Sequence, residues 1–346
     1  MDEQSLQKII RRKILVVKPS SLGDVIHSLP FLYSVKRQMP GLHVHWVIAE
    51  ELAPLLEGHL LIERLWKIKK DEWKKPGRLF QTGRELAALS EGLRAEGFDA
   101  VFDLQGLLRS ALIARAARAG AVIGFKEARE GAGFFYSHKV SVPGKAKIHA
   151  VERYLGMAEF AGFKAEVEFP LPGIEDFVPP LEKYAVIAPG ARWLSKRWPA
   201  GRFGELAGRL PLKSLVIGGA GDKGLAEEVV SGSGGKAIQY AGKSSLKVLV
   251  EIIRHAAFMV TNDSGPMHIA AALGVPVIAI FGPTDPGLTG PYGKGTRVVI
   301  KGQAECAPCR RRVCESMRCM NETGTGMVLD AIGKLPCIAQ TKQNLS

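Results

Sequence analysis

Residues 258–286 read FMVTNDSGPMHIAAALGVPVIAIFGPTDP and are the most informative stretch of the chain. An apolar run that ends at Thr261 has the composition of a buried strand, and Ser264 or Asp263 is placed to cap the helix that follows. That helix would stop at Gly274, before a second apolar run over Val277–Phe281. A strand, a helix and a strand in this order predict a βαβ unit of a parallel sheet.

The start of this helix is a candidate anion site. Its free N–H groups, with Gly265 allowing close approach, suit a diphosphate, and His268 can reach the same place. Taken alone, Asp263 is more often a helix cap than a ligand contact, and His268 could be an ordinary surface residue. Two successive turns rich in glycine and hydroxyl groups favour phosphate binding, but they do not identify the ligand.

The same alternation of short strands and helices extends along the whole chain of 346 residues. The proline-rich segment Glu168–Tyr184 interrupts it and is the best candidate for a linker. We therefore expect an α/β protein of two doubly wound, Rossmann-like domains, residues 1–172 and 173–346, facing across a cleft; the last segment could pack back on the first domain. Expected strands are Ile14–Val17, Val44–Val47, Ala100–Asp103, Tyr184–Ala188, Ser214–Ile217, Phe258–Thr261 and Val277–Phe281. Expected helices include Val25–Gln38, Gly83–Ala95, Leu107–Arg118, Val151–Ala161 and Gly201–Arg209.

The composition is that of a globular protein with an acidic partner. Apolar residues make up 46% of the chain and the net charge is +13. Before residue 172 there are 26 basic against 20 acidic residues, and after it 21 against 14, so neither half holds all the excess. Aromatic residues are not interleaved with the bases, which makes nucleic acid the weaker choice beside a phosphorylated small molecule or a lipid surface. No apolar run approaches the roughly 18 to 20 residues that cross a bilayer, and no secretory signal is evident, so we expect a cytoplasmic protein.

Two segments are similar to nucleotide-binding motifs but lack a residue that each motif requires. GAGDKG at 219–224 fits G-x-G-x-x-G, yet the segment after it lacks the acid that would hold a dinucleotide ribose. AIQYAGKS at 237–244 has Ala237 where the Walker loop requires glycine. Neither an NAD enzyme nor a nucleoside triphosphatase is favoured.

Two further turns carry candidate chemistry. Asp24 stands in KILVVKPSSLGDVIHSLPFL (13–32), where an apolar run opens into a helical pattern. Capping the helix that follows is one explanation for a lone carboxylate at this place. Lys196 stands in PGARWLSKRWP (189–199), where Arg192 and Arg197 could help it neutralise phosphate, although a solvated basic loop is about as probable for any one of these bases.

Four cysteines cluster near the C-terminus. Cys306, Cys309, Cys314 and Cys319 have a spacing that could offer four thiolates to zinc. Reduced thiols in a surface loop are the favoured alternative, because disulfides are rare in the cytoplasm.

Together, KPSSLGDVIHSLP, FDLQGLLRSALIAR, AREGAGFFY, HAVERY, PGARWLSKRWP, TNDSGPMHIAAALGVPVIAIFGPTDP and GPYG resemble glycosyltransferase family 9, the ADP-heptose:lipopolysaccharide heptosyltransferases. The resemblance covers residues 18–293. It implies a GT-B architecture, with the acceptor bound by the first domain and the nucleotide sugar by the second. It also implies inverting transfer with no cofactor or catalytic metal.

The resemblance also implies roles for individual residues. Asp24 matches the catalytic base, and Lys196 matches the lysine that offsets charge on the departing diphosphate. Donor contacts would come from Lys196, Asp222, Ser244, Asp263, Ser264, Gly265, His268 and Thr284. Acceptor contacts would come from Ser21, Arg109 and Arg129. Ala191 and Arg192 stand where close family members carry small hydroxyl residues, which leaves the finer phosphate contacts open.

By resemblance, the substrates are ADP-heptose and a Kdo-containing lipid A acceptor, used at the cytoplasmic face of the inner membrane. AREGAGFFY and HAVERY are similar to the enzymes that add the first heptose, whereas the cysteine run is similar to those that add the second. A family member with a heptosylated core or another sugar acceptor therefore remains an alternative. The more distant alternative is a non-catalytic module that binds nucleotide sugars.

Overall fold

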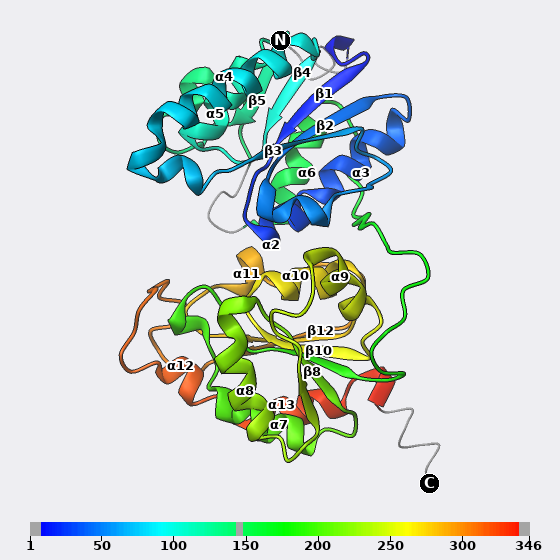
Figure 1. Cartoon of the computed structure of the whole chain (residues 1–346), viewed down its shortest axis with the longest axis vertical. Helices are drawn as coiled ribbons and strands as arrows, with labels where there is room; N and C mark the ends of the chain where they lie inside the picture. The colour runs from blue at the N-terminus through cyan, green and yellow to red at the C-terminus, as the bar shows by residue number, and fades with distance from the viewer. Residues whose placement is uncertain (1–7, 143–147, 339–346) are drawn as a thin grey trace. The chain divides into compact units, whose positions relative to one another are not determined.

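The computed structural model describes residues 8–142 and 148–338, and the chain divides into two compact units, Met1–Pro172 and Gly173–Ser346 (Figure 1). No helix or strand lies between the helix that ends at Phe160 and the strand that begins at Ala185. This irregular stretch contains the segment that the sequence marks as a linker. Each unit is described by itself below.

The first unit is built on a six-stranded parallel sheet in the order β3-β2-β1-β4-β5-β6. This is the strand order of a Rossmann fold. Its strands are β1 (Lys13–Val17), β2 (His43–Ala49), β3 (Arg64–Ile68), β4 (Ala100–Asp103), β5 (Ala121–Phe125) and β6 (His138–Val140). Its helices are α2 (Leu22–His27), α3 (Leu29–Gln38), α4 (Leu79–Ala95), α5 (Leu108–Ala116) and α6 (Ala150–Phe160), with 3₁₀ turns η1 (Glu50–Leu55), η2 (Glu72–Lys74), η3 (Pro76–Arg78) and η4 (Ala132–Phe135).

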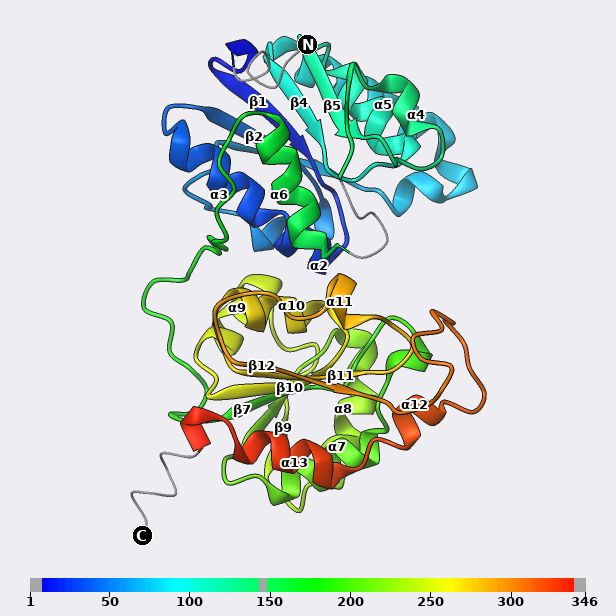
Figure 2. The same cartoon turned by 180° about the vertical axis from the view of Figure 1, so that it is seen from behind.

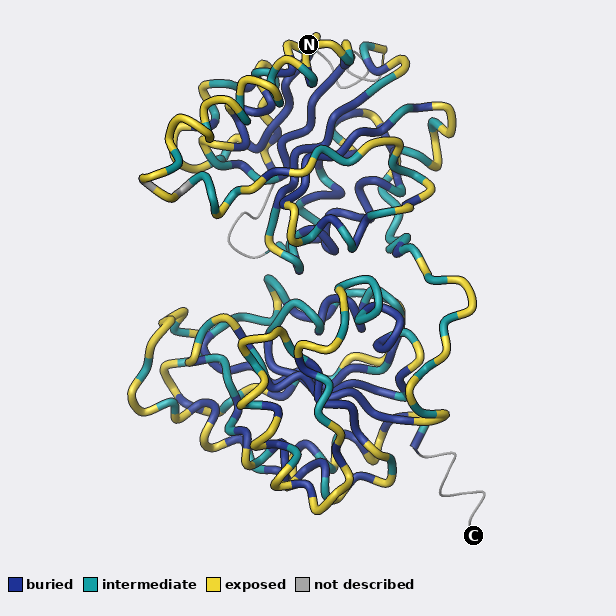
Figure 3. The backbone as a smooth tube through the Cα atoms, viewed as in Figure 1, coloured by how far each residue is buried: buried dark blue, intermediate teal, exposed yellow. Residues whose placement is uncertain are grey.

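Helices cover both faces of this sheet. Figure 2 shows α3 and α6 over one face. On the other face, Leu93 of α4 and Ala111 and Ile113 of α5 share a core with Leu15 and Val101 of the strands. Figure 3 shows the buried strands inside a shell of partly exposed helices.

The second unit repeats the topology. Its parallel sheet has the order β12-β11-β10-β7-β8-β9, which is the Rossmann order again when the strands are counted from β7. Its strands are β7 (Ala185–Ala188), β8 (Ser214–Val216), β9 (Ala237–Gln239), β10 (Phe258–Asn262), β11 (Val277–Phe281) and β12 (Arg297–Lys301). Its helices are α7 (Ala200–Arg209), α8 (Lys223–Ser231), α9 (Leu246–Arg254), α10 (Gly265–Ala272), α11 (Pro286–Thr289), α12 (Arg318–Asn321) and α13 (Thr325–Gly333), with 3₁₀ turns η5 (Leu194–Lys196) and η6 (Ala220–Asp222).

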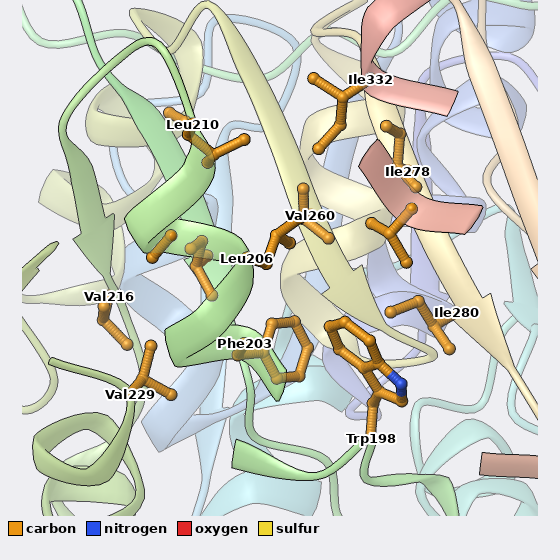
Figure 4. Packing of buried hydrophobic residues seen from close by; sticks show 14 of the residues in the cluster. Trp198, Phe203, Leu206, Leu210, Val216, Val229, Val260, Ile278, Ile280 and Ile332 are labelled. Carbon is orange, nitrogen blue, oxygen red and sulfur yellow. The ribbon is translucent and has the colours of Figure 1, made fainter. Parts of the chain in front are cut away.

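Trp198 and Phe203 anchor the core of this unit (Figure 4). Their rings meet edge to face with centroids 4.8 Å apart. Val260 and Ile280 of the sheet pack in the same cluster, as does Ile332 of α13. Up to Ile338, the last segment of the chain therefore packs into the second unit.

The α/β class and the parallel sheets predicted from the sequence are confirmed. The predicted helix Val25–Gln38 is wrong in one respect, because two helices meet at Ser28. Pro30 is the second residue of α3; it has no N–H to donate, and its ring would clash with a carbonyl in a continuous helix.

Within residues 8–142 and 148–338, no helix has both the length and the apolar character that crossing a bilayer demands.

Candidate functional site

Both candidate sites lie where the strand order of a sheet reverses. In the first unit β1 has β2 on one side and β4 on the other, and in the second unit β7 has β8 and β10. Chains that leave the carboxyl ends of such strands diverge and open a crevice for ligands. Asp24 follows β1, Lys196 follows β7, and Asp263 follows β10. The sequence-predicted catalytic and phosphate-binding residues therefore occupy the two reversal points.

Asp24 is held from three directions yet stays partly exposed. Its Oδ2 accepts hydrogen bonds from the backbone N–H of Ser21 at 3.1 Å and from the Ser21 hydroxyl at 2.8 Å. Its Oδ1 accepts one from the Tyr154 hydroxyl at 3.3 Å. The side chain remains 39% accessible to solvent. Oδ2 thus takes part in the capping box of α2, Oδ1 contacts Tyr154 and Lys18, and the carboxylate is still partly exposed to solvent.

Lys18 lies beneath this carboxylate. Its ammonium group is 3.8 Å from Asp24 Oδ1, donates to the carbonyl of Leu104 at 3.3 Å, and lies 5.0 Å from the centre of the Tyr154 ring. Burial lowers the pKa of Lys18 and Asp24 opposes that shift, while the guanidinium groups of Arg153 and Arg129 lower it further. Burial, and next the charge of Asp24, raise the pKa of Tyr154 well above its ordinary value. The tyrosine is therefore a lasting hydrogen-bond donor to the carboxylate.

Asp103 organises the loops beside Asp24. It is fully buried at the end of β4 and accepts hydrogen bonds from the backbone of Gln105 and Gly106 and from the hydroxyls of Ser110 and Tyr136, at 2.6 to 3.1 Å. Burial raises its pKa despite these donors. Because Ser110 is on α5 and Tyr136 follows η4, this carboxylate ties the two segments to the carboxyl edge of the sheet.

The structure places the three predicted acceptor residues differently. Ser21 contacts Asp24 directly. Arg129 is exposed, its backbone N–H donates to the carbonyl of Gly106, and its positive charge lowers the pKa of Lys18. Arg109 is also exposed, but its guanidinium donates to the carbonyl of Lys70, at the segment that follows β3. Only Ser21 and Arg129 are thus shown to belong to the surroundings of Asp24.

In the second unit, Lys196, Asp263 and Thr284 form one cluster. Lys196 Nζ donates to Asp263 Oδ2 at 2.6 Å, and the Thr284 hydroxyl donates to the same oxygen at 2.6 Å. Asn262 braces the cluster, since its side chain accepts from the N–H of Trp198 and donates to the carbonyl of Pro189. Three turns that are distant in sequence therefore converge at the carboxyl edge of this sheet.

Helix α10 begins beside this cluster as predicted. Ser264 is its N-cap residue and Gly265 its first residue. The Ser264 hydroxyl hydrogen-bonds the Thr261 hydroxyl at 3.1 Å. His268 is buried within the helix. The first N–H groups of α10 lie next to Asp263 in sequence, in the arrangement that suits an anion.

Asp222 and Ser244 lie at neighbouring turns. The Asp222 carboxylate accepts from the N–H of Gly219 at 2.9 Å and is 4.0 Å from the guanidinium of Arg197. A Cβ at Gly190 would come within 2.9 Å of this carboxylate, so only glycine allows its present position. Ser244 is partly buried in the turn before α9. Asp222 thus joins the turn that carries Lys196, whereas no described contact brings Ser244 to it.

The cysteine loop contacts the turn that carries Lys196, because the Ser195 hydroxyl donates to carbonyls of the loop. In the part of the chain that the structure describes, no three His, Cys, Asp or Glu side chains are placed to hold a metal ion. Cys319 is buried in α12, where burial raises its pKa, whereas Cys306 is exposed on the loop. The zinc candidates Cys306, Cys309, Cys314 and Cys319 are therefore not brought together as zinc ligands here.

The arginines of that loop are the residues that the sequence analysis missed in this unit. Arg312 lies 5.4 Å from the centre of the Trp193 ring, and Lys196 lies 4.5 Å from it. The Ser195 hydroxyl donates to the carbonyls of Arg311 and Arg312. A cavity of about 230 Å³ is lined by Thr284 and also by Gly282, Asp285, Lys301 and Pro308 among others. The run CRRR at 309–312 is the signal in the sequence that this loop is positively charged.

Comparisons with known proteins point to one family. The profile described as "Glycosyltransferase family 9 (heptosyltransferase)" matches residues 86–319. Lipopolysaccharide heptosyltransferase 1 of Pseudomonas aeruginosa is 33% identical over 321 residues, which are 87% of each chain. The protein of that name in Escherichia coli K12 is 32% identical over 299 residues, 83% of this chain and 92% of its own.

The solved structure of E. coli heptosyltransferase WaaC with ADP matches this chain with a TM-score of 0.78 at 27% identity, covering 93% of this chain and 99% of that one. The two Rossmann-like units give the predicted GT-B fold class. On the family match and the identity to these relatives, the chain belongs to glycosyltransferase family 9.

Proposed function

We propose that this chain transfers L-glycero-D-manno-heptose from ADP-heptose to a Kdo-containing lipid A acceptor, with inversion at the anomeric carbon. The family assignment and the names of the relatives support the donor, the sugar and the class of acceptor. The observation that carries the chemistry is the Asp24 carboxylate, which is partly exposed and fixed by Ser21, Tyr154 and Lys18.

The reaction is a single displacement. An acceptor hydroxyl oxygen attacks the anomeric carbon, its proton passes to Asp24, and the bond from that carbon to the diphosphate oxygen breaks. ADP leaves with the electron pair of that bond. A base placed in this way typically contributes about 10²- to 10⁴-fold to the rate.

Lys196 would neutralise the departing diphosphate. Its ammonium group is already at the carboxyl edge of the sheet, paired with Asp263 beside the start of α10. We assign Lys196, Asp263, Ser264, Gly265, His268 and Thr284, with Asp222 and Ser244, to the donor, and Ser21, Arg109 and Arg129 to the acceptor. Positive charge placed where negative charge develops stabilises the transition state.

Because the acceptor is a lipid, we also infer that the enzyme works at the cytoplasmic face of the inner membrane as a peripheral protein. The net charge of +13 supports this location, since that leaflet is negatively charged.

The first prediction tests the base. Asp24→Asn should lower kcat by about 10²- to 10⁴-fold and leave the affinity for ADP-heptose unchanged, because the amide cannot take up the proton. Product is measured by mass after incubation with ADP-heptose and truncated lipid A acceptors, both with and without a first heptose. The control is Glu91→Gln, the same change of carboxylate to amide on the exposed face of α4.

Full activity of Asp24→Asn would refute the role of the base. A wild-type protein that binds ADP-heptose but transfers to none of the acceptors would point to the non-catalytic alternative. Transfer only to the heptosylated acceptor would identify a second-heptose enzyme.

A further inference from the structure

Several large apolar side chains of the first unit face solvent. Phe80 is 81% exposed, Leu79 74% and Phe134 91%, and Leu108 and Leu112 are also exposed. We call these five residues the apolar rim. A group of this kind on a folded domain indicates a surface that contacts a partner or a membrane.

The apolar rim follows one edge of the sheet. Leu79 and Phe80 open α4 after β3, Leu108 and Leu112 lie on the first turns of α5 after β4, and Phe134 is in η4 after β5. Since the strands are parallel, all three segments leave from their carboxyl ends, at the edge that also carries Asp24. Arg109 at the start of α5 donates to the carbonyl of Lys70 at 3.2 Å, which links α5 to the chain between β3 and α4.

The start of α4 has no apolar cover within the described residues. Among the 17 residues of this helix, Leu93 near its end is buried, whereas the first turn presents Leu79 and Phe80 to water. A helix that only covered its own sheet would turn these side chains inward. The first turn is therefore built to contact something outside the unit.

The charge of the neighbouring segment indicates what kind of partner the first turn of α4 contacts. Residues 67–84 contain seven bases, Lys67, Lys69, Lys70, Lys74, Lys75, Arg78 and Arg84, against the acids Asp71 and Glu72. Both Lys75 and Arg78 pair with the single carboxylate of Glu72. Three acids outside the segment also pair with it, Glu57 with Lys67, Glu51 with Lys70 and Glu85 with Arg78. Seven bases therefore meet five acids, which leaves a net charge of +2 (7 − 5). The Arg84 guanidinium lies 6.0 Å from the centre of the Phe80 ring, so a cation lies beside the exposed side chains of Leu79 and Phe80. Apolar tips among lysines and arginines are typical of segments that lie in the interface of an anionic bilayer.

We propose that the apolar rim and the bases of residues 67–84 dock the first unit on an anionic phospholipid surface. This inference rests on the proposed function, because an enzyme that acts on a lipid acceptor has to reach that acceptor in the membrane. Docking by this edge brings the side of the sheet that carries Asp24 to the lipid headgroups. The acceptor's sugars can then reach the carboxylate while its acyl chains stay in the bilayer.

The second prediction measures docking with the full chain. In a flotation assay, most of the wild-type protein should float with vesicles of phosphatidylethanolamine and phosphatidylglycerol. A much smaller fraction should float with vesicles of phosphatidylcholine alone. The double variant Leu79→Ser with Phe80→Ser should bind at least about tenfold more weakly, because it lacks two apolar side chains that the bilayer would bury. Arg84→Gln should weaken binding about fivefold, the value expected for one interfacial charge.

Matched controls remove similar groups elsewhere. Leu60→Ser with Val178→Ser deletes two exposed apolar side chains outside the apolar rim, and Arg94→Gln changes an exposed arginine at the other end of α4. Both should float like the wild-type protein. Circular dichroism checks that every variant is folded. Equal flotation of the Leu79–Phe80 variant and the wild-type protein overturns the proposal, as does a wild-type protein that binds neither kind of vesicle.

Transfer assays separate this inference from the proposed function. The Leu79–Phe80 variant should keep the wild-type kcat/KM on a soluble acceptor without acyl chains and lose at least about tenfold on acceptor embedded in anionic vesicles. An equal loss on both acceptors would place these residues in acceptor binding and overturn docking. If the wild-type protein transfers to neither acceptor, the proposed function fails, while flotation still decides docking.

Discussion

At the scale of single residues, Lys18 buries an ammonium group against a carboxylate that remains open to solvent. A buried cation with one carboxylate at 3.8 Å and one carbonyl partner is costly to maintain for the fold alone. Its position is explained if it keeps Asp24 ionised and oriented. The sequence analysis did not single out Lys18, because a lysine at the end of a strand usually extends into solvent.

The third prediction concerns Lys18→Met, which keeps the length of the side chain and removes its charge. The kcat should fall, and the acidic limb of its pH profile should move to higher pH, because the carboxylate loses a nearby cation. Lys18→Arg should recover part of the activity. An unchanged pH profile in Lys18→Met would leave this lysine with a structural role only.

The same variant tests the pKa of Lys18 through stability. Burial places the pKa of folded Lys18 below its ordinary value of 10.5, so over the interval between the two the unfolded chain binds more protons. In that interval Lys18 makes the free energy of unfolding rise with pH. Lys18→Met should lack this rise, which denaturant titrations at a series of pH values ending near 10.5 can measure. Parallel curves for the two proteins would contradict it.

At the scale of elements, the central strands could be predicted from sequence and the outer ones could not. All seven predicted strands exist, within one or two residues at most ends. Four of the five that were missed, β3, β6, β9 and β12, are the edge strands of the two sheets. An edge strand need not be a continuous apolar run, because solvent reaches it.

The fifth missed strand, β5, is interrupted by Gly124. A Cβ at that position would come within 2.3 Å of the Tyr136 ring, so the glycine makes room for the tyrosine that donates to Asp103. The residue that weakens the local strand pattern is required by a contact from a distant segment. Such a contact cannot be read from the neighbouring sequence.

The fourth prediction concerns α13, which joins the core of the second unit through Ile332. Ile332→Ala should lower the free energy of unfolding by about 2 to 5 kcal/mol, because it leaves a cavity in a packed core. Met327→Ala on the exposed side of the same helix should change it by no more than about 0.5 kcal/mol. Chemical denaturation of the three proteins measures both values. Similar losses in the two variants would contradict the packing of α13.

At the scale of the whole molecule, the cluster that we assign to the donor lies within one unit. Lys196, Asp263 and Thr284 all belong to residues 173–346, and Asp24 belongs to residues 1–172. The sequence analysis named all four of these residues, because each stands in a turn after a recognisable strand. It could not show that Lys196 and Thr284 share one oxygen of Asp263, since that depends on how three turns pack.

The fifth prediction follows from this division. Cleavage in the irregular stretch that follows Pro172 should release a fragment beginning near Gly173 that binds ADP within about tenfold of the intact chain, a change of about 1.4 kcal/mol. The fragment that ends near Pro172 should not bind it. Calorimetry on the separated fragments measures both. Loss of ADP binding by the second fragment would mean that the first unit supplies essential donor contacts.

The repeated strand order has a historical consequence. Two units that fold with one topology are what duplication and fusion of a half-length gene would leave behind. In each copy the turn after the first strand carries the group of interest: a carboxylate at Asp24 in one and an ammonium group at Lys196 in the other. One ancestral turn would then have diverged into opposite charges, which the proposed function uses for two tasks: one descendant would accept a proton and the other would stabilise a leaving anion.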